Sequence, residues 1–381
     1  MLYRSFQDIK ISALGFGAMR LPVIDGDDSK IDVESAKKMV DEAFRSGINY
    51  FDTAWGYHNG NSELVMGEAL ASHPRESFYL ADKFPGYDLG NMTKIREIFP
   101  EQLRKTGMEY FDFYLFHNVC EMNIDYYLDP KYGIYDYLMQ MKKEGKIKHL
   151  GFSCHGELDV LKRFLDAYGK DMEFCQLQLN YLDWTFQHGK EKVEMLREWG
   201  IPVWVMEPLR GGKLANNMPE RFSEKLKAMR PDEEIPAWGF RFLMSIPEVT
   251  VILSGMSNMD QLQSNVKTFS EEKPLSESEM AGLMEVADDM LSVRSVPCTA
   301  CHYCVSHCPM ELDIPRLIAL FNEHNLTVDG GGFDFIAPMA VGALPAEKKP
   351  SACLHCQSCE AVCPQNIGIS GIMEEFAGIV G

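Results

Sequence analysis

The chain has 381 residues, of which 46% are hydrophobic and 24% are charged. This length and composition predict a globular protein with a large core, and they exclude a disordered chain. There are 37 Lys and Arg residues against 56 Asp and Glu residues, which gives a formal net charge of −19. That charge disfavours nucleic acids and anionic membranes as partners, because both would be repelled.

The two ends of the chain indicate its compartment. The N-terminal sequence MLYRSFQDIK has no apolar stretch of the kind found in a secretory signal, and no apolar run is long enough for a membrane span. Most of the 11 Cys residues lie in two tight groups near the C-terminus. In a chain without an export signal, such groups indicate metal ligands and not disulfides. We therefore expect a cytoplasmic protein.

Short β-rich runs alternate with longer amphipathic runs up to about Leu291. Eight strands are expected, at Ala13–Gly17, Asn49–Thr53, Phe78–Lys83, Phe111–His117, Lys148–Ser153, Phe174–Asn180, Pro202–Glu207 and Thr250–Ser254. Helices are expected between them, for example at Val33–Ser46, Ile134–Lys143, Leu158–Tyr168 and Glu191–Trp199. Each of these helices ends near a glycine that would cap it, namely Gly47, Gly145, Gly169 and Gly200.

This alternation predicts an α/β fold, specifically a (β/α)₈ TIM barrel over residues 1–292. The strand candidates are mostly apolar throughout, as is typical of parallel strands buried on both faces. A doubly wound sheet is the main alternative, but it usually carries a glycine-rich loop after its first strand. Here the corresponding sequence LGFGAMRLP lacks that spacing and leads into Pro22. Residues 293–381 are expected to form a second, smaller domain.

Four polar residues fall at the ends of consecutive strand candidates, where a barrel carries its chemistry. Asp52 closes the run NYFD, Lys83 closes YLADK and His117 closes FDFYLFH, while Tyr57 lies just beyond the first of these runs. Together they suit carbonyl reduction. An ammonium would lower the pKa of a phenol that must donate a proton, and a neutral imidazole would orient the carbonyl oxygen. Each residue alone has an ordinary structural explanation.

The sequences DTAWGYHNGNSELVMGEAL, LADKF and LFHN resemble the aldo-keto reductase family. The resemblance implies that Tyr57 is the general acid, that Lys83 and Asp52 tune it, and that His117 orients the carbonyl. It also implies a nicotinamide nucleotide, NADP or NAD, bound at the mouth of the barrel. The product would come from hydride transfer to an aldehyde or ketone, which makes a small carbonyl compound the expected substrate.

The resemblance also implies residues that contact the nucleotide. They include partners for the nicotinamide amide, the loop MEPLRGGKL over the pyrophosphate, and the segment LSGMSNMDQLQSN around the adenosine half. The expected contacts are Gly17, Ser153, Gln178, Met206, Leu209, Gly211, Ser254, Gly255, Gln261 and Asn265. Met206 stands where many family members have an aromatic ring. Gly255 and Gln261 stand where many have Lys and Arg, so the choice between NAD and NADP stays open.

The C-terminal region contains the motif C-x-x-C-x-x-C-x-x-x-C-P twice. This spacing is typical of two 4Fe-4S clusters, in which the fourth Cys of each motif binds the other cluster. One cluster is therefore expected on Cys298, Cys301, Cys304 and Cys363, and the other on Cys353, Cys356, Cys359 and Cys308. Zinc and disulfides fit this pattern poorly. The sequences IPRLIALFNEHN and ISGIMEEFAGIV indicate helices, so the domain resembles α-helical ferredoxins, with a turn at Gly330–Gly332.

The two halves differ in the number of electrons they move. A nicotinamide transfers a hydride, whereas a cluster transfers single electrons, and no flavin motif is evident although a bound flavin is not excluded. The favoured hypothesis is a carbonyl reductase that exchanges electrons with a redox partner protein or an unrecognised flavin. The alternatives are a nucleotide-binding electron-transfer or redox-sensing protein, and clusters that only stabilise the fold.

Overall fold

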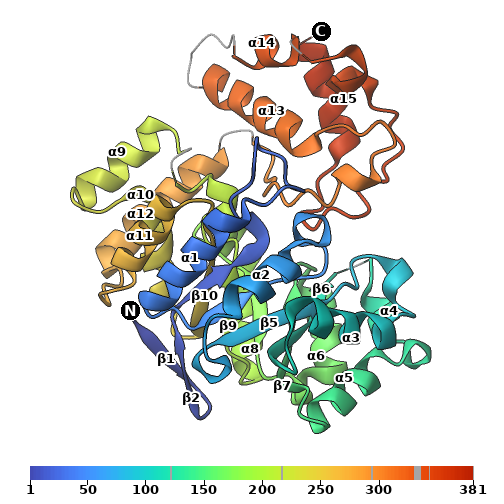
Figure 1. The fold of residues 1–381 in the computed structure, drawn as a ribbon. Helices are drawn as coiled ribbons and strands as arrows, with labels where there is room; N and C mark the ends of the chain where they lie inside the picture. Colours follow the sequence, from blue (N-terminus) through green and yellow to red (C-terminus); the bar gives the residue numbers. More distant parts are fainter. Residues whose placement is uncertain (121, 216–217, 293–294, 330–335, 343, 381) are drawn as a thin grey trace. The chain divides into compact units, whose positions relative to one another are not determined.

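The computed structural model describes residues 1–381 apart from 121, 216–217, 293–294, 330–335, 343 and 381 (Figure 1). The chain divides into two compact units. The first combines Met1–Pro208 with Arg230–Met280, and the second combines Leu209–Met229 with Ala281–Gly381. None of the described helices is long and apolar enough to cross a membrane.

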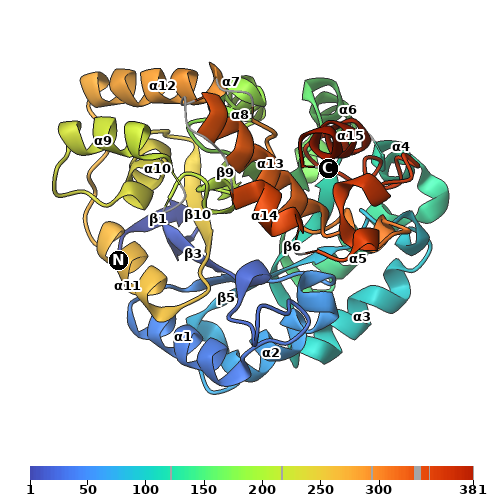
Figure 2. The same cartoon turned by 90° about the horizontal axis from the view of Figure 1, so that it is seen from above.

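The first unit is built on a closed barrel of eight parallel strands surrounded by helices (Figure 2). The strands are β3 (Leu14–Gly17), β4 (Tyr50–Asp52), β5 (Tyr79–Phe84), β6 (Phe111–Val119), β7 (Ile147–Cys154), β8 (Cys175–Gln178), β9 (Val203–Met206) and β10 (Val249–Gly255). They pair in chain order, and β10 pairs with β3 to close the ring. The predicted (β/α)₈ barrel is confirmed, and each predicted strand overlaps an observed one.

The helices around the barrel alternate with its strands. They are α1 (Val33–Arg45), α2 (Ser62–Leu70), α3 (Ile95–Thr106), α4 (Ile124–Leu128), α5 (Ile134–Lys143), α6 (Leu158–Tyr168), α7 (Asp183–Phe186), α8 (Gly189–Glu198), α10 (Ile235–Met244) and α11 (Met259–Thr268). Three of the four predicted cap glycines have a positive φ: Gly47, Gly145 and Gly200. Gly169 is right-handed instead. A Cβ there would lie 2.7 Å from the Trp199 ring, so close packing explains that glycine.

An N-terminal hairpin that the sequence did not predict precedes the barrel. Its strands are β1 (Tyr3–Phe6) and β2 (Ile9–Ser12), which pair antiparallel. The Phe6 ring lies 4.9 Å from the Trp204 ring and 5.8 Å from the Phe113 ring, both inside the barrel. The hairpin thus contributes to an apolar layer of the barrel interior, consisting of Phe6, Ile11, Tyr50, Ala81, Phe113, Leu115, Phe174, Trp204, Val251 and Leu253.

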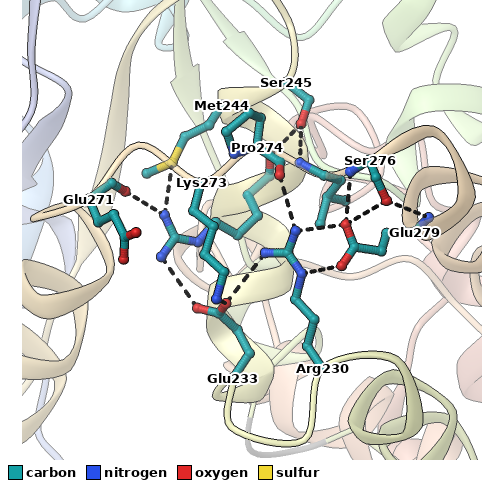
Figure 3. Close-up of polar contacts among 11 residues, drawn as sticks. Arg230, Glu233, Met244, Ser245, Glu271, Lys273, Pro274, Ser276 and Glu279 are labelled. Atoms are coloured by element: carbon teal, nitrogen blue, oxygen red, sulfur yellow. Dashed lines mark hydrogen bonds and ion pairs between the residues drawn. The ribbon is translucent and has the colours of Figure 1, made fainter.

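A group of charged side chains fastens the segment after α11 to α10 (Figure 3). Arg230 donates to both carboxylate oxygens of Glu279, at 2.5 and 2.7 Å. Lys273 lies 3.1 Å from Glu233, and Arg241 donates to the Glu271 carbonyl at 2.7 Å. The hydrogen bond from Arg230 lowers the pKa of Glu279 to about 2. These contacts are structural, because they join chain segments on the outside of the barrel.

The second unit is mainly helical, as expected. It contains α9 (Glu220–Met229), most of α12 (Glu277–Ser292), α13 (Ile314–Asp329), α14 (Ile336–Gly342) and α15 (Ile369–Val380). Its apolar core joins α13 to α15, and the rings of Phe321 and Phe376 lie 5.6 Å apart. The turn expected at Gly330–Gly332 lies outside the described residues.

Candidate active site and metal centres

The four predicted catalytic residues meet at the C-terminal end of the barrel strands. The Lys83 ammonium lies 2.5 Å from Asp52 Oδ1 and donates to the Thr53 carbonyl at 2.7 Å. It lies 5.0 Å from the centre of the Tyr57 ring. The Tyr57 and His117 rings are 6.1 Å apart and nearly perpendicular. Parallel pairing of β4, β5 and β6 brings these side chains to one rim.

The lysine and the carboxylate form a buried ion pair. Burial raises the pKa of Asp52, and the charge of Lys83 opposes this rise. Burial acts to lower the pKa of Lys83, but the charge and hydrogen bond of Asp52, together with Tyr57 and Asp82, outweigh burial and the net pKa is raised. The ammonium therefore stays protonated inside the barrel, as the sequence predicted.

Burial has a larger effect on the phenol than the sequence suggested. Burial raises the pKa of Tyr57 to about 12, although the charge of Lys83 and its hydrogen bond lower it. The expectation that the Tyr57 pKa would be lowered overall was wrong, because burial destabilises the phenolate more than the ammonium of Lys83 stabilises it. Burial, assisted by Lys83, lowers the pKa of His117 well below its usual value. A neutral imidazole was predicted, and the direction agrees.

The residues expected near the nicotinamide lie on three adjacent strand ends. Ser153 is the residue before the end of β7, and its Oγ accepts from the Asn118 N–H at 2.7 Å. Gln178 ends β8 and donates to Asp183 at 2.8 Å. Met206 ends β9 directly beside Gln178. The structure thus brings Ser153, Gln178 and Met206 to one side of the barrel rim.

The residues expected near the adenosine half gather where β3 meets β10. Gly17 pairs with Gly255, and Ser254 Oγ accepts from Asn265 at 3.0 Å. The side-chain oxygen of Gln261 accepts from the Ser257 N–H at 2.7 Å, so it turns back onto its own helix start.

The side chain of Arg20 packs beside Gly255. A Cβ on Gly255 would lie 3.1 Å from the Arg20 side chain.

Leu209 and Gly211 belong to the second unit and form a turn there. Gly211 has a φ of 65°, which suits glycine.

Two cavities in the second unit are each lined by four cysteines. The first is lined by Cys298, Cys301, Cys304 and Cys363, and the second by Cys308, Cys353, Cys356 and Cys359. Each set combines three thiols from one motif with the fourth thiol of the other motif, which is the arrangement the sequence predicted. Among the described residues, no three His, Cys, Asp or Glu side chains converge closely enough to hold a single metal ion.

The backbone winds in the same way around both cavities. Ala300 and His302 flank the second Cys of the first motif with φ of 54° and 63°. His355 and Gln357 flank the second Cys of the other motif with φ of 53° and 59°. Left-handed residues other than glycine are strained and persist where the surroundings demand them. The donor chemistry and this shared winding fit a cubane cluster in each cavity.

Comparison with known families agrees with this geometry. The model of the aldo/keto reductase family matches residues 13–288, and that of the 4Fe-4S dicluster domain matches residues 297–367. The chain belongs to the aldo-keto reductase family. It carries a 4Fe-4S dicluster domain after the reductase barrel.

Similar proteins cover the reductase part of the chain. The NADH-specific methylglyoxal reductase of Escherichia coli is 26% identical over 308 residues, covering 69% of this chain and 91% of its own. The L-galactose dehydrogenase of Arabidopsis thaliana is 26% identical over 285 residues, covering 69% and 86% respectively. A solved aldo-keto reductase from Bacillus halodurans, in its holo form, superposes with a TM-score of 0.61 at 26% identity. It covers 75% of this chain and 96% of that chain.

Three residues of this aldo-keto reductase barrel join the site without having been predicted. Gln176 donates to Asp52 Oδ2 at 3.0 Å and holds the second oxygen of that carboxylate. Tyr87 lies with its ring 5.2 Å from the His117 ring and nearly perpendicular to it. Burial lowers the pKa of His155 to about 4, and a hydrogen bond to Gln178 opposes this. Tyr87 and His155 lie just beyond strand ends, which was the available signal, whereas Gln176 lies within β8.

Proposed function

We propose that this protein is a carbonyl reductase that uses a nicotinamide nucleotide and carries two 4Fe-4S clusters. The observation that carries the proposal is the buried Lys83–Asp52 pair, at 2.5 Å, beside Tyr57 and His117. A phenol, an ammonium and a neutral imidazole around one rim suit proton donation to a carbonyl oxygen. The substrate is a small aldehyde or ketone.

A bound reduced nicotinamide would supply the hydride, that is, the two electrons that the carbonyl carbon accepts. His117 is neutral and donates a hydrogen bond that orients the carbonyl oxygen. Tyr57 gives its proton to that oxygen, and Lys83 stabilises the resulting phenolate. Asp52 keeps Lys83 protonated, and Gln176 holds Asp52 in place.

Tyr57→Phe tests this mechanism. It removes the proton donor while keeping the ring, so carbonyl reduction should fall by about 10²- to 10⁴-fold, the usual contribution of general acid catalysis. The measurement is kcat/KM for NADH oxidation with a panel of aldehydes, using anaerobically reconstituted protein. Tyr79→Phe, a change to a partly exposed tyrosine on the same barrel, is the control. Unchanged turnover in Tyr57→Phe would falsify the mechanism.

We also propose that the nucleotide is NADH. Gly255 and Gln261 offer no charge to a 2′-phosphate, and the Gln261 carbonyl oxygen is engaged with the Ser257 N–H. The similar protein of Escherichia coli is named as NADH-specific. Gln261→Arg should raise kcat/KM for NADPH by about tenfold, the size of one charge-assisted hydrogen bond. Gln263→Arg on the same helix is the control, and an equal gain there would contradict the assignment.

For the second unit we propose one 4Fe-4S cluster in each cysteine-lined cavity. Cys298, Cys301, Cys304 and Cys363 would hold the first, and Cys308, Cys353, Cys356 and Cys359 the second. The clusters would pass single electrons to or from a partner protein in a reducing cytoplasm, with a flavin or the partner converting between one and two electrons.

A second candidate function is nucleotide-dependent electron transfer or redox sensing without carbonyl turnover. The observation that favours it is Met206, which stands at the end of β9 where many aldo-keto reductases present an aromatic ring to the nicotinamide. Tight NADH binding that changes the cluster spectrum, without product from any carbonyl compound, would support this function over the first.

A further inference from the structure

A buried polar cluster lies on the outer side of β5, behind the catalytic lysine. Asp82 precedes Lys83 in the strand and points the opposite way, toward α2 and α3. The cluster consists of Glu63, Asp82, Gln102, Lys105 and Tyr114, and it contains two carboxyl groups, both fully buried.

A single amide joins the two carboxyl groups. Gln102 Nε2 lies 2.8 Å from Asp82 Oδ1 and 3.0 Å from Glu63 Oε1. Its Oε1 accepts from the Tyr114 hydroxyl at 2.5 Å, which fixes the orientation of the amide. Lys105 donates to the other oxygen of Glu63. Lys105, the one ammonium among these five residues, therefore forms its ion pair with Glu63.

Asp82 is left with one oxygen to be accounted for. Among the described residues, no hydrogen-bond donor reaches its buried Oδ2. The shared Gln102 amide holds the Glu63 carboxylate close to Asp82, and after burial the charge of Glu63 is the main cause that raises the pKa of Asp82 well above its usual value. Carboxylates only accept hydrogen bonds, so two of them held side by side can bond to each other only if one carries a proton.

The balance of buried charges also indicates that one carboxyl group carries a proton. Fully ionised, the cluster and the catalytic pair would hold three buried carboxylates, on Asp52, Glu63 and Asp82, against the two ammonium groups of Lys83 and Lys105. An uncompensated buried charge is costly. One proton restores the balance. We propose that Asp82 carries this proton at neutral pH, shares it with Glu63, and acts as a positioning residue for Lys83.

The contacts of Asp82 explain how it would position the lysine. The pairing of β5 with β4 ends at Ala81, two residues before Lys83. Beyond it, the Lys83 N–H donates to Asp82 Oδ1 at 2.8 Å and the Lys83 carbonyl accepts from Gln102 at 3.0 Å. On the side of β4 the side-chain cluster thus supports the lysine backbone in place of strand pairing, while β6 pairs with Lys83 on the other side.

Loss of the proton would alter the catalytic pair. It would place a second negative charge near Lys83, in addition to Asp52. The ammonium would then stabilise the Tyr57 phenolate less. The titratable groups that face Asp82 are Glu63 from α2, Lys105 from α3, Tyr114 from β6, and Lys83 and Tyr87 from β5 and the loop after it. This consequence rests on the proposed carbonyl reduction, whereas the proton itself does not.

Infrared spectroscopy of the full reconstituted chain tests the proton directly. Protein labelled with ¹³C in the Asp carboxyl groups should show the carbonyl band of an un-ionised Asp at pH 7. The band should vanish in Asp82→Asn and persist in Asp112→Asn, a second buried Asp whose carboxylate accepts from Arg75 at 2.6 Å. It should also vanish in Glu63→Gln, because Asp82 would then ionise and pair with Lys105.

Each outcome decides the proposal. A missing band in the unmodified protein, or a band that survives Asp82→Asn, overturns the protonated Asp82. A band that survives Glu63→Gln overturns the sharing. In the unmodified protein, the band should disappear at alkaline pH with the same midpoint as a step in the pH profile of kcat/KM, and Asp82→Asn should lack that step. If the infrared band behaves as predicted but the pH profile of kcat/KM shows no such step, the positioning role is overturned and the proton assignment stands.

Discussion

At Tyr57, burial and charge act on the pKa in opposite directions. Burial raises the pKa to about 12 even though Lys83 lies 5.0 Å from the ring and lowers it. Lys83→Met removes the ammonium whose charge and hydrogen bond lower the pKa of Tyr57, and it leaves the charge of Asp52, which raises that pKa. We expect kcat/KM for carbonyl reduction to fall at least about 100-fold, as for loss of one electrostatic stabiliser. Lys148→Met, on an outward part of β7, should not change it.

Glu173 gives the clearest pH dependence of stability. Burial acts to raise its pKa, but hydrogen bonds from His149, Lys142 and Gln7 outweigh burial and lower the pKa from 4.5 to about 2. The unfolded carboxylate takes up a proton near its ordinary pKa, whereas the folded one stays ionised to about pH 2. The stabilisation is therefore complete above pH 4.5 and is lost as the pH falls toward 2.

Glu173→Gln should therefore cost about 3 kcal/mol of unfolding free energy at pH 7, and much less near pH 2. The measurement is urea unfolding of the barrel as a function of pH. Glu157→Gln is the control, because Glu157 is exposed. A loss that is the same at both pH values would contradict the assignment of the lowered pKa to Glu173.

Site residues at strand ends were predictable because a (β/α)₈ barrel carries its active site at the C-terminal ends of its strands. Asp52, Lys83, His117 and Tyr57 follow from that rule. The support behind them was not predictable. Gln176 lies 124 positions from the Asp52 carboxylate it binds, and no local pattern indicates such a pair. The sign of the Tyr57 pKa shift was also missed, because a sequence does not state how much water a side chain retains.

Among the elements, the two cysteine loops make the sharpest prediction. Because each cavity takes its fourth thiol from the other motif, Cys363→Ala should destroy the same cluster as Cys298→Ala. Cys308→Ala should destroy the other one. Each single variant should keep about half of the iron and one EPR signal, with Cys363→Ala and Cys298→Ala sharing a spectrum. If Cys363→Ala instead matched Cys353→Ala, the crossed assignment would be wrong.

Strands were predicted better than the connections between them. The eight barrel strands are apolar runs buried on both faces, so composition alone marked them. The hairpin β1–β2 was missed because its strands, YRSF and IKIS, mix polar and apolar residues and lack the continuous apolar run of the barrel strands. Gly169 was predicted as a helix cap and does end α6, but it is right-handed, and a glycine is needed there because a Cβ would lie 2.7 Å from the Trp199 ring. That requirement comes from a residue 30 positions away.

At the scale of the whole molecule, the two units depend on their cofactors to different degrees. The second unit holds a small apolar core and two strained loops that the clusters would tie together. Anaerobic removal of iron with a chelator should therefore raise hydrogen exchange across 298–380 and leave the barrel strands β3–β10 protected. Uniform loss of protection in both units, or unchanged exchange in 298–380, would contradict this dependence.

Isotope transfer in a single turnover tests the central claim most directly. The reconstituted protein is mixed anaerobically with NADH deuterated at C4 and an aldehyde, and both the product and the EPR signal of the clusters are followed. The account predicts an alcohol with deuterium on its carbinol carbon in the unmodified protein, and about 10²-fold slower formation in Tyr57→Phe. Reduced clusters without deuterated alcohol would contradict it.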